Sequence, residues 1–380
     1  MKFEFLLLYR QKLIVLATFI SLLLSALALW NGWAQIASIE NEIQHATHAE
    51  SERFEQQIKK LGRGGEAGET GYYLYHTVYN APGEWSFISL GNKSYSPHIQ
   101  RIRLLGLQAQ LYDGESHNPE YAVAGNFDFA FVVIFILPLF CIALAHDLCP
   151  IERAKGRLEL IRSLSSSEVM LWSRRLLLRW LIASLSVTLP LLACALILQL
   201  SLIVTIGVAL AVSAYALFWI LLSGLLSFRS SQPSASANAT LCLAVWLLMT
   251  ILIPSTAKVF INDITPIVSG SEIALSHRKK VHDAWDLPKE HTFKTFFEYY
   301  PEWQSTPPVT SRFHWKWYYA FQHVADISVS QAVEDRQQAL LLRDARSRTI
   351  SFLLPSVRLQ YWLDDLANSN LHNLLEFRRK

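Results

Sequence analysis

Long runs of apolar residues dominate the chain, and polar or charged segments separate them. A helix needs about 20 apolar residues to cross the hydrocarbon core of a membrane. The block 180–228 is too long for a single crossing, so a tight turn is expected near Gln199–Leu202. We therefore predict five transmembrane helices, over residues 13–33, 129–145, 180–200, 201–228 and 239–257. The fold class is then mainly α, in an integral membrane protein.

The first long polar segment, residues 35–128, follows the first predicted span. Isoleucine, leucine and phenylalanine recur at helical spacing over 35–61, which predicts that the first helix continues beyond the membrane. The glycine-rich stretch 62–68 ends that helix, and it lacks the Lys-Ser/Thr pair of a phosphate-binding loop. Alternation in the runs YYLYHTVY, WSFISL and IQRIRLLGLQAQLY over 71–112 predicts a few strands, so this insertion is α+β.

The last segment, residues 258–380, is predicted to be mostly helical, with a polar helix over 328–349. Within it, residues 351–363 are apolar but number only 13 and contain Pro355 and Arg358. Such a run favours an interfacial or re-entrant helix over a crossing. A sixth span at this place stays open as the alternative.

An aromatic cluster, FHWKWYYAF over 313–321, precedes the polar helix. One interpretation is an aromatic box that binds a ligand. The other, which we favour, is a core or membrane-surface anchor, because Trp and Tyr prefer boundaries between apolar and wet surroundings.

Charge placement predicts how the helices are oriented. The short loop 146–179 carries seven Lys or Arg, whereas segment 35–128 has seven Lys or Arg against twelve Asp or Glu. Because basic residues favour the cytoplasmic side, residues 1–34 hold a cytoplasmic N-terminus and the first span, and 146–179 is a cytoplasmic loop. Segments 35–128 and 258–380 are then periplasmic. With 52% hydrophobic and 17% charged residues and a net charge of +3, the composition does not favour nucleic acid as a partner.

The four cysteines, Cys141, Cys149, Cys194 and Cys242, all lie in or next to predicted spans. None falls in the long polar segments, so no disulfide framework is expected there. Their spacing fits no zinc site either. We expect small residues buried among helices, and no bound metal or cofactor.

The loop HDLCPIERAKGRLELIRSLSSSEVMLWSRRLLLR, residues 146–179, carries the most information. Pro150 is predicted to begin a short amphipathic helix over 151–164. Ser165 and Glu168 have the spacing of a capping box, which predicts a second helix that runs into the third span. A basic helix at this place can bind anionic lipid, or it can bind a cytoplasmic partner.

The run LPLFCIALAHDLCPIERAKGRLELIRSLSSSEVMLWSRRLLLR resembles the signature of type-2 ABC (ATP-binding cassette) transporter permeases. That signature has an acidic residue, Glu-Arg, Gly, a Leu-rich stretch, Ser and a basic residue before the next span. Here the matching positions are Asp147, Glu152-Arg153, Gly156, 158–164, 165–167 and Arg174-Arg175. Residues 118–139 and 313–326 resemble a poorly characterised subgroup with large periplasmic insertions, often described only as a domain of unknown function. Relatives usually continue past the position of Lys380, so the C-terminus looks short.

The resemblance implies a permease subunit without its own ATPase, in the inner membrane of a bacterium. The loop after the second span would hold a coupling helix, with Glu152, Arg153, Gly156, Arg157 and Leu160 facing the ATPase. The implied partners are a cytoplasmic ABC ATPase that binds the ATP, a second permease subunit in a homo- or heterodimer, and membrane lipids. No catalytic residue is implied, and the chain contains no Walker A motif. The substrate and the direction of transport stay open.

Three alternatives stay open. The loop helix can be a membrane-surface helix without a partner. The chain can be a membrane-anchored periplasmic receptor or scaffold, although the loop 146–179 is too small for an output domain. An intramembrane enzyme would need His146 and Asp147 as an acid–base or metal pair, but adjacent residues point to different faces of a helix.

Overall fold

A computed structural model describes residues 8–113, 126–164, 167–229 and 234–379. Five of its helices are long and apolar enough to cross a membrane, which indicates a multi-pass membrane protein. They are α2 (Lys12–Leu61), the composite helix Phe129–Ala154, α10 (Glu168–Ile197), α11 (Leu202–Arg229) and the composite helix Ala235–Asp263. The prediction of a mainly α protein with five such helices is confirmed.

Both composite helices contain a π-helical turn just before a proline. The first consists of α6 (Phe129–Phe131), a π turn over Val132–Ile136, α7 (Leu137–Ala145) and α8 (Pro150–Ala154). The second consists of α12 (Ala235–Leu247), a π turn over Leu248–Leu252 and α13 (Ile253–Asp263). Pro138 and Pro254 open the segments that follow the two π turns. A proline removes one helical hydrogen bond and displaces the preceding turn, and the wider π turn accommodates that displacement.

The predicted turn between the third and fourth spans is confirmed. α10 ends at Ile197 and α11 begins at Leu202. Gln199 has a φ of 55°, and Leu200 N donates to Ala195 O at 3.0 Å. The reversal therefore needs only the four residues between the helices.

The helix α2 packs against α10, and its buried residues in this part are small. They are Ser21, Ser25 and Ala28. Small residues let helix backbones approach closely, which is how helices associate in lipid. The Ser21 and Ser186 hydroxyls are 3.0 Å apart and hydrogen-bonded between the two helices.

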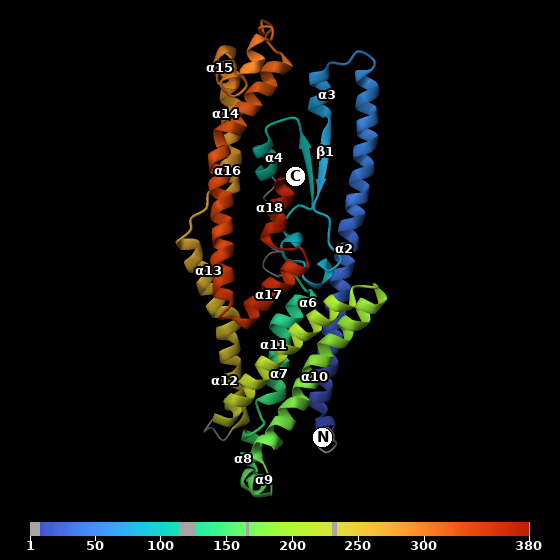
Figure 1. The fold of residues 1–380 in the computed structure, drawn as a ribbon, viewed down its shortest axis with the longest axis vertical. Helices are drawn as coiled ribbons and strands as arrows, with labels where there is room; N and C mark the ends of the chain where they lie inside the picture. Colours follow the sequence, from blue (N-terminus) through green and yellow to red (C-terminus); the bar gives the residue numbers. More distant parts are fainter. Residues whose placement is uncertain (1–7, 114–125, 165–166, 230–233, 380) are drawn as a thin grey trace.

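Figure 1 shows the five long helices at one end of an elongated molecule and the polar segments at the other. The N-terminus and α8 lie at the far end of the helix bundle, which we call the loop end. α2 runs on beyond the bundle alongside the polar segments, and its C-terminus is closed at Gly62, whose N–H donates to Ile58 O at 3.0 Å. The expected helix over 35–61, ended by the glycine-rich stretch, is thus present.

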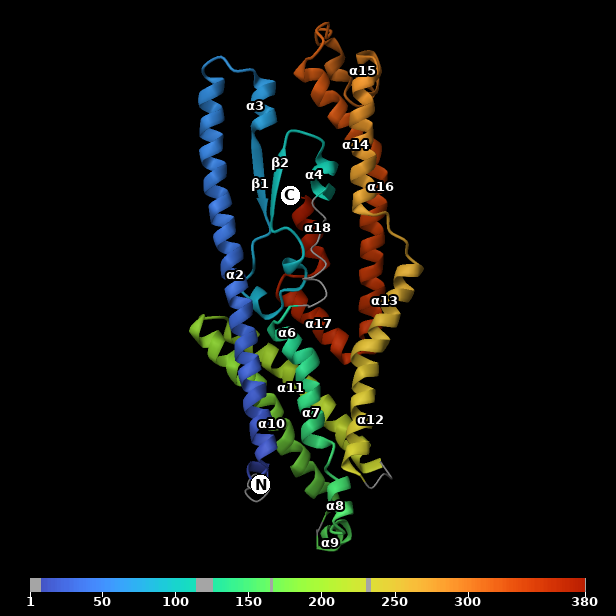
Figure 2. The same ribbon diagram turned by 180° about the vertical axis from the view of Figure 1, so that it is seen from behind.

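The α+β part is small. After α3 (Ala67–Tyr73), strands β1 (Tyr75–Tyr79) and β2 (Ile99–Arg103) form an antiparallel pair next to α2 (Figure 2). The Glu50 carboxylate on α2 accepts hydrogen bonds from Thr77 N at 3.1 Å and from the Tyr79 hydroxyl at 3.0 Å. Although burial opposes it, these bonds lower the pKa of Glu50, and they attach the sheet to α2.

The prediction of strands is wrong for two stretches, residues 85–90 and residues 107–112. Residues 85–90 form a 3₁₀ turn (Ser86–Ile88), because all six are buried and their surroundings do not alternate between core and solvent. Residues 107–112 belong to α4 (Leu107–Asp113). The Asp326 carboxylate accepts from Leu107 N at 2.7 Å and Gln108 N at 3.0 Å, which stabilises the start of that helix.

The C-terminal segment contains α14 (Gly270–Asp286), α15 (Lys289–Tyr299), α16 (Trp315–Ser351), α17 (Pro355–Leu366) and α18 (Leu371–Arg379). The predicted helix over 328–349 is present as part of the longer α16. α17 has 12 residues and is not among the five candidate spans. Its buried Leu359 and Leu363 belong to the same core as the bundle helices, so residues 351–363 contribute a helix packed on the bundle.

The aromatic cluster divides between two surroundings. Trp317 and Phe321 are buried in a small core with Ala284 of α14. Lys316 and Tyr319 instead line a cavity of about 480 Å³ beside α15. The favoured core interpretation holds for the buried pair, which lies far from the bundle and so does not anchor it at a membrane surface (Figure 1).

The residues 85–90 join the polar part to the bundle and to α17. Ser86 Oγ donates to Ala367 O at 2.7 Å, and Ser89 Oγ donates to the Asp364 carboxylate at 2.5 Å. Leu90 N donates to Asp128 at 2.9 Å, directly before α6. This junction therefore connects three segments that are distant in the sequence.

An ion pair fixes α17 against α16. The Arg348 guanidinium donates two hydrogen bonds of 2.7 Å to Asp365 and one of 2.7 Å to Asp344. We expect Arg348→Ala to lower the free energy of unfolding by roughly 1–2 kcal/mol, a value reduced because the pair is partly exposed to solvent. Thermal unfolding of the purified chain in detergent measures this, with the exposed Arg312→Ala as the neutral control. An equal effect of the two substitutions would contradict the assignment.

The loop end of the helix bundle as the candidate functional site

Two short helices lie at the loop end, where the chain passes from the second long helix to the third. They are α8 (Pro150–Ala154) and α9 (Leu158–Leu164), and we call them the loop helices. In Figure 1 they project from the bundle at the end that also holds the N-terminus, opposite to the polar segments. All five residues that the resemblance assigns to coupling lie in this region.

The prediction of one continuous helix over 151–164 is wrong, because Gly156 breaks it. Gly156 has a φ of 64°, a left-handed conformation that glycine adopts without steric cost. Its N–H donates to Arg153 O, and Arg157 N donates to Glu152 O, both at 2.9 Å. These bonds close the end of α8, so the chain changes direction before α9.

The predicted capping box is wrong as well. Ser165 lies outside the described residues, and α10 begins at Glu168 with Ser167 as its N-cap. Ser167 Oγ accepts from Met170 N at 3.3 Å. Glu168 is therefore in the first turn, where it pairs with Arg162 of α9 at 3.1 Å.

Glu152 is the centre of an ion-pair network. Its carboxylate lies 3.0 Å from Arg157 Nε, beyond the turn, and 3.5 Å from an Arg175 nitrogen on α10. The Glu152 side chain is only 13% exposed. It thus ties the loop helices to the long helix that follows them.

Other predicted residues of the loop face outward. Leu160 is 58% exposed, and Val169 and Met170 at the start of α10 are exposed as well. Leu158 is buried instead, so the apolar residues of α9 do not form a single face. Exposed apolar side chains beside charged ones are typical of a surface that binds a partner.

A cavity of about 440 Å³ lies behind the loop helices. Its charged lining residues are Arg10, Asp147, Glu152, Lys155, Arg157, Arg175 and Arg179. Of these residues, Arg175 belongs to the stretch that resembles the permease signature, whereas Arg10 and Arg179 lie outside the residues assigned to coupling. Their clustering follows from the proximity of the N-terminus to α10, which no local pattern reveals.

Arg179 joins two long helices at the loop end. It is 7% exposed, and its Nε donates to Leu144 O of α7 at 2.7 Å. The helix that contains it runs from Glu168 without interruption, which agrees with the predicted helix that runs from the loop into the third span. The contact between Arg179 and α7 was not predicted, because the two helices are distant in the sequence.

The side chains of His146 and Asp147 do not point to a shared site, as an acid–base pair would require. His146 Nδ1 contacts the carbonyl oxygens of Ile142 and Ala143, at 3.0 and 3.2 Å, in the last turn of α7. Asp147 lines the cavity instead. The His146 ring thus satisfies helix carbonyls at a C-terminus, a common structural use of histidine. The cysteines are free, with Cys141, Cys149 and Cys242 buried, as expected of small residues among helices.

Comparison with known proteins reaches only the other end of the molecule. Residues 271–380 match a family described as Domain of unknown function (DUF3526). No curated protein and no solved structure matches the chain. The matched region comprises α14 to α18 and contains neither the bundle nor the loop helices.

Proposed function

We propose that the chain is the permease subunit of an ABC transporter, coupled through its loop helices to a separate ATPase that binds ATP. The observation that carries the proposal is the pair α8–α9, which projects at the loop end and is tied to α10 through Glu152. A force applied by a bound partner would pass along these ion pairs to the long helices. The resemblance over 118–180 supports the same assignment.

The proposal includes an orientation and a location. The loop end is cytoplasmic, because the short loop 146–179 carries seven Lys or Arg, and the polar segments are periplasmic. The membrane is the inner membrane of a bacterium, and a second permease subunit completes the transporter. A reporter that is active only in the cytoplasm, fused after Lys380, is expected to stay silent; activity of that reporter would contradict this orientation.

Coupling is tested with the double substitution Glu152→Ala and Arg157→Ala. It removes one negative and one positive charge, so the net charge is unchanged while the ion pair is lost. The chain is purified from its native membranes in mild detergent, and the bound ATPase is quantified by mass spectrometry and by ATP hydrolysis. We expect at least a tenfold loss of both, because charged groups fix the register of such a contact.

The matched control is Glu55→Ala with Lys59→Ala, an exposed i,i+4 pair at the other end of α2. This control should retain the ATPase fully. If the loop double variant retains it to the same extent, the coupling assignment is wrong.

The second candidate is a membrane-anchored receptor or scaffold. The continuous helix α2 favours it, since one element runs from the loop end along the polar segments to α3. A receptor of this kind would co-purify without an ATPase and would not change ATP hydrolysis, so the same measurement separates the two functions.

A further inference from the structure

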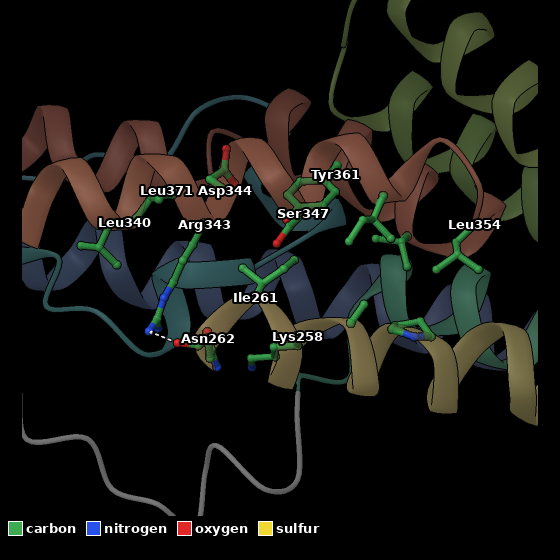
Figure 3. A pocket seen from close by; sticks show the side chains of 14 residues that line it. Lys258, Ile261, Asn262, Leu340, Arg343, Asp344, Ser347, Leu354, Tyr361 and Leu371 are labelled. Atoms are coloured by element: carbon green, nitrogen blue, oxygen red, sulfur yellow. Dashed lines mark hydrogen bonds between the residues drawn. The ribbon is translucent and has the colours of Figure 1, made fainter. Parts of the chain in front are cut away.

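A third cavity lies where the fifth long helix leaves the bundle. It measures about 410 Å³ and is enclosed by α13, the C-terminal half of α16 and the start of α17 (Figure 3). A volume of about 300–1,000 Å³ is typical of sites for small molecules. The cavity is separate from the loop helices, at the opposite end of the bundle (Figure 1).

The lining of this cavity combines an apolar end with an end that carries charge. Toward the bundle it consists of Pro254, Ile350, Leu354 and Val357. Away from the bundle, Lys258, Asn262 and Arg343 line it together with the apolar Leu340 and Leu371. Figure 3 shows Leu354 at one end of the cavity and Arg343 with Asn262 at the other. Such a lining matches a molecule with an apolar chain and a charged head.

Exposed apolar side chains surround the cavity at the same level. Phe352 and Leu353, in the turn between α16 and α17, are 71% and 79% exposed, and Val259 and Phe260 on α13 are also exposed. Large apolar side chains gathered on a surface mark a contact with lipid or protein. Arg358 lies 4.3 Å from the centre of the Phe352 ring, as basic residues do at the boundary between lipid and water. The cavity therefore lies beside an exposed apolar surface with a neighbouring arginine, the combination expected of a contact with lipid.

The polar end of the cavity is cationic. Arg343 donates to Thr265 O at 2.8 Å and to Asn262 O at 3.2 Å, and these neutral acceptors hold its guanidinium without cancelling the charge. Asp344, the acidic lining residue, is already paired with Arg348 at 2.7 Å. The Lys258 side chain has no hydrogen bond or ion pair to any described residue. Two positive charges thus face this end of the cavity.

We propose that this cavity binds an anionic phospholipid from the adjacent leaflet of the membrane. One acyl chain lies along Pro254, Ile350 and Val357, and the phosphate lies between Lys258 and Arg343. The volume fits part of one lipid, so the second chain stays in the membrane. That the bound lipid is cargo rests on the proposed function, whereas the binding itself does not.

The test uses the full chain alone, without ATP or an ATPase, so that its failure is distinct from a failure of coupling. The protein is reconstituted into nanodiscs that contain phosphatidylglycerol with a photoreactive acyl chain. After irradiation, the labelled peptides of the protein are identified. We expect labelling of α13 and of the segment that includes the end of α16 and the start of α17. Phosphatidylcholine with the same chain should label these peptides several-fold less, because its head carries no net charge.

Substitutions test the binding of the lipid head group separately from the binding of its acyl chain. Lys258→Ala should reduce phosphatidylglycerol labelling about fivefold, the effect of one basic group near a charged lipid. Ala257→Trp fills the cavity and should remove the labelling, whereas Ser255→Trp, on a different face of the same helix and outside the lining, should leave it unchanged. Equal labelling by the two lipids, or unchanged labelling of Ala257→Trp, would overturn the proposal. The thermal unfolding of each variant is compared with the wild type to show that the fold is intact.

Discussion

Replacing Gly32 with alanine will lower the free energy of unfolding by about 3 kcal/mol or more, at the upper end of the cost of overpacking. An added Cβ at this position would lie 2.0 Å from the carbonyl oxygen of Phe87 and 3.0 Å from its carbonyl carbon. Both are backbone atoms, so no side-chain rotation relieves the contact. Either α2 or the buried turn at 85–90 must shift.

The shift would disturb the largest core of the protein. Phe87 and Ile88 belong to it, together with Leu29 and Ile36 of α2 on either side of Gly32. Thermal unfolding of the purified chain in detergent measures the effect. Gly207→Ala is the matched control, because Gly207 also lies in a long apolar helix but has nothing within 4 Å of an added Cβ. That control should be neutral or slightly stabilising, since alanine is the better helix former; similar losses for both substitutions would contradict the close approach at Gly32.

The second large effect is expected at Asp128, the N-cap of α6. Its carboxylate accepts hydrogen bonds from Phe131 N at 2.8 Å and from Leu90 N at 2.9 Å. Asp128→Ala leaves both buried N–H groups without an acceptor, at a cost of about 2–4 kcal/mol in the free energy of unfolding. Asp128→Asn keeps one oxygen acceptor and should therefore lower the free energy of unfolding by less. An alanine variant as stable as the asparagine variant would contradict this role.

The contribution of Asp128 depends on pH. Burial raises its pKa from 3.8 to about 6, although the hydrogen bonds from Phe131 and Leu90 act in the opposite direction. The folded state thus favours the protonated acid. The resulting stability is complete below about pH 4 and is lost as the pH rises through about 6. The stability of the wild type relative to Asp128→Asn should therefore increase as the pH is lowered from 7 to 4, and a constant difference across this range would contradict the raised pKa.

The long helices could be predicted because lipid imposes a strong requirement on sequence. Every backbone group in the membrane must be paired within a helix, so a span needs a long run of apolar residues. The same reasoning located the turn near Gln199, since one block held enough residues for two crossings. Helix α2 could be followed beyond the membrane because its periodicity continues to the glycines that end it.

The errors occurred where distant segments decide the local structure. The run 85–90 is apolar enough for a strand, but it is buried among α2, α6 and α17, and the described part of the chain pairs no strand with it. A single glycine such as Gly156 is tolerated within a helix at a cost of about 1 kcal/mol, so the sequence alone does not require a break there. The break reflects the return of α9 toward α10, where Arg162 pairs with Glu168. The lipid cavity combines α13 with residues about 80 to 100 positions later, so no local pattern marks it.

The length of α2 has a mechanical consequence. At about 1.5 Å per residue, its 50 residues span about 75 Å as a single lever. Among its contacts, the one at Gly32 is a close approach to the backbone of Phe87, and a pivot there would divide the helix unequally. About 30 Å of the helix lies on the side of the loop end and about 44 Å on the other side. If the helix pivots at Gly32, a movement of 2 Å at its N-terminal end produces a movement of about 3 Å in the opposite direction at its C-terminal end.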